Sequence, residues 1–191
     1  SVGRIPYYGS IADLDSILAK SIAYENESDT AWRRKALLPM EPLDTSTPAY
    51  HCGENIKDRV LIPNGWAYHR LYDAVEGAPA AESVPCNYST VLSAWQGDRY
   101  GLVVWMTHGW YGGGSDVMDI QNAALLTDDN AAHPSFTYHG SCSNAEPEYD
   151  NNIAYTLLKR GAVTTVAATR VSWYWVGQTD FTHTTSIGGY G

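Results

Sequence analysis

One cysteine and one histidine, each placed just after an apolar run, are the residues of this sequence best suited to covalent chemistry. His108 follows the run at 102–106, and Cys142 follows the run at 135–138. A cysteine thiolate is a strong nucleophile, and a histidine within hydrogen-bond reach can activate it or protonate a leaving amine. The two residue types together predict acyl transfer through a thioester on Cys142.

Acyl transfer also requires N–H donors for the negatively charged oxygen that forms during the reaction. The glycine after His108 allows the backbone to approach a substrate closely, so the N–H groups of Gly109 and Cys142 are the predicted oxyanion donors. A third group is expected to orient His108. The acidic candidates for it are Glu41 and Asp44, and sequence spacing does not decide between them.

Other interpretations of these residues remain open. A cysteine in a strand is often a small buried apolar residue, although the glycine and serines around Cys142 indicate the end of a strand. His139 competes with His108, but residues three apart on an extended chain do not easily face each other. A metal hydrolase built on His108, His133, His139 and an aspartate is another hypothesis, although no pair has the close helical spacing of a zinc motif.

The elements around these residues alternate between strands and helices. Apolar periodicity predicts helices at 11–24, 54–61, 91–95 and 153–159, strands at 36–38, 102–106, 135–138 and 162–169, and an ambiguous element at 66–72. Alternation of this kind predicts an α/β fold, with a mostly parallel sheet flanked by helices, as a single domain over residues 1–191. Ligands bind beyond the carboxyl ends of such strands, where His108 and Cys142 are both placed.

Composition excludes some classes of function. The net charge of −9 argues against a nucleic-acid surface, which needs a basic patch. No apolar run approaches the roughly 20 residues of a membrane span. Of the three cysteines, Cys52 and Cys86 lie in loop-like sequence and could form a disulfide that leaves Cys142 as the thiol, but three separate reduced cysteines are an equal alternative.

The order of these motifs resembles the caspase–haemoglobinase fold, and within it the gingipain-type cysteine peptidases. The resemblance depends on an apolar strand, His-Gly, about thirty residues, a second apolar strand, a small residue and Cys. It extends over nearly the whole chain. The segments that carry it besides His108-Gly109 and Cys142 are Val2-Gly3-Arg4-Ile5-Pro6 with the helix ending at Tyr24-Glu25, the strand segment 32–38, Trp95-Gln96-Gly97, Gly161-Ala162-Val163 and Ala168-Thr169-Arg170.

The resemblance assigns roles to particular residues. It implies His108 as the catalytic histidine, Cys142 as the nucleophile, and Glu41 as the acid that assists the histidine. Trp173 or Trp175 would line the pocket for the residue before the scissile bond.

The resemblance also bears on specificity, metals and context. Relatives specific for Arg or Lys carry an aspartate near the start of a helix where this chain has Glu54 or Asn55, and Asn55 is the predicted substrate-binding residue. The caspase signature around the cysteine is absent. The family binds structural Ca²⁺, for which no ligands are assigned. The chain is expected to belong to a larger precursor, to be secreted or exposed at the cell surface, and to contact other segments of that precursor.

The leading interpretation is a cysteine endopeptidase that acts on polypeptides and needs no cofactor for its chemistry. The alternative is a catalytically inactive peptidase-like module used for binding or assembly. The two differ in whether His108 and Cys142 share one open crevice with preorganised donors.

Overall fold

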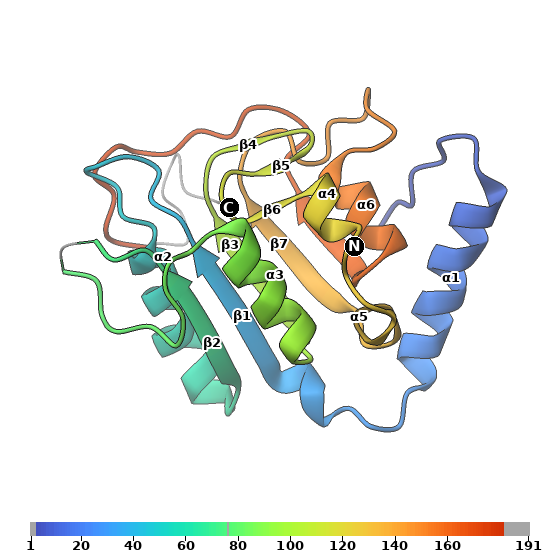
Figure 1. Cartoon of the computed structure of the whole chain (residues 1–191), viewed down its shortest axis with the longest axis horizontal. Helices are drawn as coiled ribbons and strands as arrows, with labels where there is room; N and C mark the ends of the chain where they lie inside the picture. The colour runs from blue at the N-terminus through green and yellow to red at the C-terminus, as the bar shows by residue number, and fades with distance from the viewer. Residues whose placement is uncertain (1–2, 76, 182–191) are drawn as a thin grey trace.

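A five-stranded parallel sheet forms the centre of the molecule (Figure 1). The structure is a computed structural model and describes residues 3–75 and 77–181. The strand order is β2-β1-β3-β7-β8, so β3 is central and β2 and β8 are the edges. The strand bounds are β1 Lys35–Met40, β2 Ala67–Tyr72, β3 Leu102–Met106, β7 Ser135–Gly140 and β8 Ala162–Ala167. The predicted α/β fold with a parallel sheet is confirmed.

Helices cover both faces of this sheet. The α-helices are α1 Ile11–Asn26, α2 Tyr50–Ile56, α3 Tyr88–Gly97, α4 Ile120–Ala123, α5 Asp128–Ala132 and α6 Ile153–Lys159. Two begin at caps that the sequence indicates: the Ser10 side chain accepts from the N–H of Asp13 at α1, and the Asn152 side chain accepts from the N–H of Tyr155 at α6. Within the described residues, no helix is long and apolar enough to cross a membrane.

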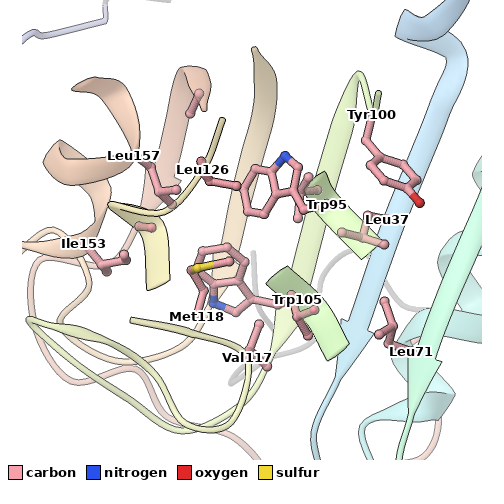
Figure 2. Packing of buried hydrophobic residues seen from close by; sticks show 14 of the residues in the cluster. Leu37, Leu71, Trp95, Tyr100, Trp105, Val117, Met118, Leu126, Ile153 and Leu157 are labelled. Atoms are coloured by element: carbon pink, nitrogen blue, oxygen red, sulfur yellow. The ribbon is translucent and has the colours of Figure 1, made fainter. Parts of the chain in front are cut away.

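Two apolar clusters, one on each face of the sheet, pack the sheet against the helices. The cluster beneath α3, α4 and α6 includes Trp95 and Trp105, each 1% exposed (Figure 2). The cluster on the opposite face packs α2 and the helical turn after it against Leu38 and Met106. Side chains of β1 and β3 alternate between the clusters, as the two-residue period of a strand requires. Because both faces are covered, the predicted strands are nearly continuous apolar runs.

Some element predictions need correction. The helix predicted at 54–61 is α2 followed by a π turn at Lys57–Leu61 and a 3-10 turn at Ile62–Asn64, and it ends at Gly65, whose φ of 69° is left-handed. The ambiguous stretch at 66–72 is the edge strand β2. Packing against β1 selects the strand there, which local periodicity could not do.

The glycine-rich segment after His108, whose composition is typical of a flexible loop, is instead a small antiparallel sheet. Its strands are β4 Gly109–Trp110, β5 Gly113–Gly114 and β6 Met118–Asp119. Side chains would obstruct this turn, since a Cβ on Gly113 would lie 2.5 Å from the Met118 carbonyl oxygen. The hairpin therefore has a fixed conformation next to the predicted histidine.

Candidate active site

His108 and Cys142 follow neighbouring strands at the carboxyl edge of the sheet. Strands β3 and β7 pair directly, with Met106 opposite Gly140, and the N–H of Thr107 donates to the Gly140 carbonyl at 3.1 Å. The chain then continues into His108 from one strand and into Cys142 from the other. The predicted shared edge is therefore present.

The residue after the histidine lies against the cysteine. A Cβ on Gly109 would lie 2.6 Å from the carbonyl oxygen of Cys142, 2.9 Å from its nitrogen and 2.8 Å from the Cβ of Ser141. The two loop backbones therefore touch at the positions predicted to supply the oxyanion donors. Only a residue without a side chain fits there.

The His108 ring is oriented by a backbone carbonyl. Its Nε2 lies 2.6 Å from the Leu43 oxygen, and since a carbonyl only accepts, Nε2 must carry the hydrogen. In the neutral ring Nδ1 is then the basic nitrogen. The ring also meets Tyr174 edge-on at 5.9 Å between centroids. The hydroxyl of Tyr174 donates to Asp44, the residue after Leu43, at 3.0 Å.

Glu41, the acid predicted to assist His108, lies among other carboxylates. Burial, together with the neighbouring charges of Asp73 and Asp116, raises the pKa of Glu41 to about 8. Among the described residues, its buried Oε2 has no hydrogen-bond partner. The His108 ring donates its hydrogen bond to the Leu43 carbonyl rather than to Glu41, so the catalytic part of Glu41 stays a prediction.

The Glu41→Gln variant is expected to remove a loss of stability at rising pH. The folded pKa of about 8 lies above the ordinary 4.5, so the folded state keeps a proton that the unfolded chain releases. Stability therefore falls as pH rises from about 4.5 to about 8, and glutamine removes this slope. At pH 8 the variant should be more stable than the parent by about 1–3 kcal/mol, and at pH 4 the two should be equal.

Urea unfolding at pH 4, 6 and 8 measures this difference, with the exposed Glu25→Gln as control. Parallel slopes for the parent and Glu41→Gln would contradict the raised pKa. The same variant tests the catalytic expectation, because unchanged turnover would exclude Glu41 from the reaction.

The thiol of Cys142 contacts the segment that follows β8. Its Sγ lies 3.4 Å from both the carbonyl oxygen and the nitrogen of Ser172. The next residues include Trp173, 80% exposed, and Trp175, 61% exposed. Both tryptophans thus follow a residue in contact with Cys142, and their part in lining a substrate pocket stays a prediction.

The other two cysteines differ from Cys142 in their surroundings. All three are free thiols, so the alternative with a Cys52–Cys86 disulfide is wrong and that with separate reduced cysteines holds. Burial raises the pKa of Cys52 to about 12 and also raises the pKa of Cys86. Neither is suited to form a thiolate near neutral pH.

The competing histidine is a core residue. His139 is 4% exposed and stacks on Trp105 with ring centroids 3.8 Å apart. Burial lowers the pKa of His139 to about 3, so it stays neutral. Within the described part of the chain, no group of three or more His, Cys, Asp or Glu could hold a metal ion, so the residues of the metal-hydrolase alternative do not form such a group there. Structural Ca²⁺, which also binds backbone carbonyls, stays an expectation.

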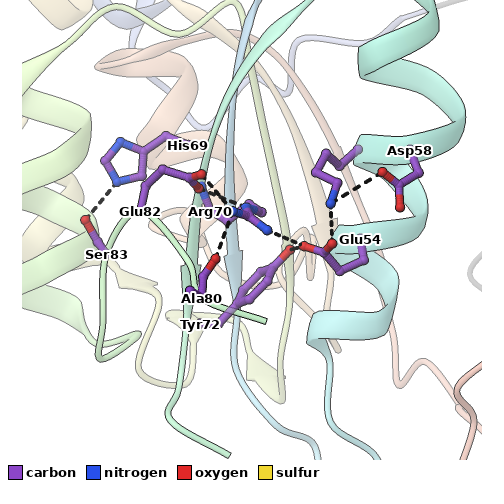
Figure 3. Close-up of polar contacts among 9 residues, drawn as sticks. Glu54, Asp58, His69, Arg70, Tyr72, Ala80, Glu82 and Ser83 are labelled. Carbon is purple, nitrogen blue, oxygen red and sulfur yellow. Dashed lines mark hydrogen bonds and ion pairs between the residues drawn. The ribbon is translucent and has the colours of Figure 1, made fainter. Parts of the chain in front are cut away.

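Of the two residues at the predicted specificity position, Glu54 is already paired (Figure 3). Its carboxylate accepts from Arg70 at 2.8 Å, from the Tyr72 hydroxyl at 3.0 Å and from Lys57. Burial alone would raise the pKa of Glu54, but these hydrogen bonds hold it below its ordinary value. Asn55, half-buried beside it, stays the predicted substrate-binding residue.

Sequence reasoning missed two groups at this site. The Leu43 carbonyl is a backbone atom and has no signature in the sequence. Asn144 is 0% exposed, and its side chain bridges the histidine and cysteine loops. An asparagine two residues after a candidate nucleophile could have drawn attention, but its partners depend on the hairpin, which was not predicted.

The fold and the paired loops define a class: a caspase-like α/β protein with a cysteine and a histidine at the carboxyl edge of its central strands. The model of Peptidase family C25 matches residues 1–187, and the chain belongs to this family of cysteine peptidases. No curated protein matches the sequence.

Solved structures agree on the fold. One is the Arg-specific cysteine proteinase gingipain R (RgpB), with a TM-score of 0.71 and 19% identity over 91% of this chain and 40% of that one. Another is the complex of Porphyromonas gingivalis RgpB pro- and mature domains, with a TM-score of 0.68 and 19% identity over 89% of this chain and 41% of that one. The chain therefore spans about 40% of the length of these relatives.

Proposed function

We propose that the protein is a cysteine endopeptidase in which Cys142 attacks the peptide carbonyl and His108 transfers the proton. The observation that supports the proposal is the contact of the Gly109 backbone with the Cys142 backbone, because the residue after the proposed base then lies against the residue that carries the proposed nucleophile. Family membership supports the same reaction class.

The proposed reaction has two steps, formation of a thioester on Cys142 and its hydrolysis. The Cys142 thiol gives its proton to Nδ1 of His108, and the sulfur forms a bond to the carbonyl carbon while the N–H groups of Gly109 and Cys142 hold the oxyanion. The C–N bond then breaks, and His108 returns its proton to the leaving amine. Water then gives a proton to His108 and attacks the thioester. The C–S bond breaks, His108 returns that proton to the sulfur, and the acid product leaves with the Cys142 thiol regenerated.

The tautomer of His108 supports the proposed proton transfer to Nδ1. The Leu43 carbonyl holds the hydrogen on Nε2, so the proton from the thiol enters at Nδ1. When the ring becomes positively charged, the same carbonyl stabilises it, because a hydrogen bond from a charged donor is stronger than one from a neutral donor. A backbone acceptor can thus perform the task expected of an acidic side chain.

Covalent labelling tests the proposal. A peptidyl chloromethyl ketone is expected to modify Cys142 alone, since the raised pKa values of Cys52 and Cys86 keep those thiols protonated. Peptide mapping by mass spectrometry identifies the modified residue, and cleavage of a mixed peptide library reports turnover. Labelling at Cys52 or Cys86 instead, or no labelling beside an intact fold, would reject the peptidase.

The contact of Cys142 with Ser172 favours a second candidate, a catalytically inactive module for binding or assembly. In that case the segment after β8 covers the thiol permanently. Absence of turnover on every library, together with slow reaction of Cys142 with iodoacetamide, would favour this candidate.

The proposed setting of the peptidase follows from its relatives. A polypeptide is the proposed substrate, and segments of the same precursor are proposed partners, which the complex of RgpB pro- and mature domains supports by analogy. A secreted or cell-surface location is proposed on the resemblance to gingipain-type peptidases.

A further inference from the structure

Asn144 connects the two loops that carry the candidate catalytic residues. Its side-chain Nδ2 donates to the carbonyl oxygens of Trp110 and Gly113, both at 2.8 Å, and to that of Cys142 at 3.1 Å. Three acceptor-only partners fix which end of the amide is the nitrogen. One side chain, 0% exposed, therefore joins the hairpin after His108 to the residue that carries the thiol.

The carbonyl oxygen of the Asn144 side chain is also hydrogen-bonded. Its Oδ1 accepts from the Ser141 hydroxyl at 2.5 Å, and the Ser141 oxygen accepts from the Trp105 ring N–H at 3.0 Å. Trp105 is anchored in the core, 1% exposed. Asn144 thus forms hydrogen bonds to the chain on both sides of the Cys142 N–H. It bonds to the Ser141 hydroxyl before this N–H and to the Cys142 carbonyl after it. A satisfied buried network of this kind is rigid.

The backbone around the cysteine bends to make these contacts. Ser143 has a φ of 53°, in the left-handed region that residues with a side chain seldom occupy. Its N–H donates to the Arg170 carbonyl at 2.9 Å, and the carbonyl of Asn144 accepts from Ala154 at 3.1 Å. These hydrogen bonds therefore hold the unusual backbone conformation of Ser143 in place, as is common at functional sites.

The register of the hairpin shows how the hydrogen bonds from Asn144 to Trp110 and Gly113 bear on the orientation of Gly109. The N–H of Ser115 donates to the His108 carbonyl at 2.8 Å, so Gly109 and Gly114 form a non-hydrogen-bonded pair. The N–H of Gly109 then points out of the hairpin and is available to a ligand. Asn144 binds both carbonyls of the neighbouring pair, Trp110 and Gly113, and so fixes the strand that presents this N–H.

We propose that Asn144 is a positioning residue that aligns the N–H groups of Gly109 and Cys142 as one oxyanion site. The inference rests on the proposed function and deepens it. Asn144 touches neither substrate nor thiol in this role. It supports oxyanion stabilisation without affecting the intrinsic reactivity of the sulfur.

The test separates reactions that need an oxyanion site from one that does not. A peptide aldehyde, built on the best substrate of the library, forms a tetrahedral adduct with an oxyanion, whereas iodoacetamide alkylates the thiol without one. In the natural full-length polypeptide, Asn144→Ala is expected to lower kcat and weaken aldehyde inhibition by about 100-fold, the effect of a misplacement near 1 Å. KM and the alkylation rate should change less than about threefold.

Three further variants distinguish the proposed positioning role of Asn144 from a general loss of stability. Asn144→Asp keeps the shape but turns an acceptor toward the carbonyls, and should reproduce the Asn144→Ala result. Ser141→Ala keeps the Nδ2 bonds and should lower kcat only about tenfold. Asn130→Ala, at a buried asparagine that caps α5 and bonds to Trp95, should reduce stability with unchanged kcat.

The outcomes are distinct. Unchanged kcat and aldehyde affinity in a folded Asn144→Ala or Asn144→Asp protein would overturn the proposal, as would an equal loss of alkylation rate, which would place the effect on the sulfur. Failure of the unmodified protein to label or turn over would instead reject the proposed function itself.

Discussion

The Cys142→Ala variant is expected to have no measurable peptide hydrolysis and no covalent labelling, a loss of at least about 10⁴-fold in kcat. The methyl group offers no nucleophile, and no neighbouring thiol can replace it. Cys142 is only partly buried, so the change should leave the free energy of unfolding within about 1 kcal/mol of the parent. Initial rates on the best library peptide, with urea unfolding beside them, measure both quantities.

Cys52→Ala is the matched control, because it removes another free thiol of the same fold. It should keep the turnover and labelling of the parent, whereas its buried sulfur makes some loss of stability expected. Residual hydrolysis in purified Cys142→Ala at more than about a hundredth of the parent rate would mean that another residue carries the reaction.

The Gly109→Ala variant is expected to lower kcat by about 10²–10³-fold. Its methyl carbon would lie 2.6 Å from the Cys142 carbonyl oxygen and 2.9 Å from the Cys142 nitrogen. These are backbone atoms, so the cysteine loop and the histidine loop must separate. The predicted oxyanion donors are on the two sides of this contact, and their spacing changes with it.

Steady-state kinetics measure the expected loss, and Gly97→Ala is its control. A Cβ on Gly97 meets nothing within 4 Å, so that variant should match the parent in both stability and rate. A folded Gly109→Ala protein with parental kcat would show that the contact between the loops is dispensable for the reaction. The proposed oxyanion site would then be wrong.

The part of this architecture that could be predicted from sequence follows from strands buried on both faces. The runs at 102–106 and 135–138 read as strands because helices cover them on either side. Parallel neighbours end at the same edge, and the spacing of His108 and Cys142 leaves room for one crossover between two such strands. The structure supplies the pairing of β3 with β7 that this spacing allows but does not require.

The rest depends on contacts that leave no local pattern. The hairpin at 109–114 reads as a glycine-rich loop, and a side chain thirty positions away, Asn144, bonds to its carbonyls. The partner of His108 is the backbone of Leu43, whose side chain gives no hint of it. Glu41 was a reasonable choice by residue type, but its charge environment comes from Asp73 and Asp116, which tertiary structure alone brings close.

The placement of the site in the sheet has an evolutionary consequence. The predicted base and nucleophile follow the interior strands β3 and β7, respectively, while the tryptophan-bearing segment follows the edge strand β8. Trp173, 80% exposed, contributes little to the core, so mutations there can accumulate without a cost in folding. Under the proposed function, the reacting pair and the tryptophans expected to line the substrate pocket are therefore encoded in separable parts of the chain, so that substrate preference can change while the reacting pair does not.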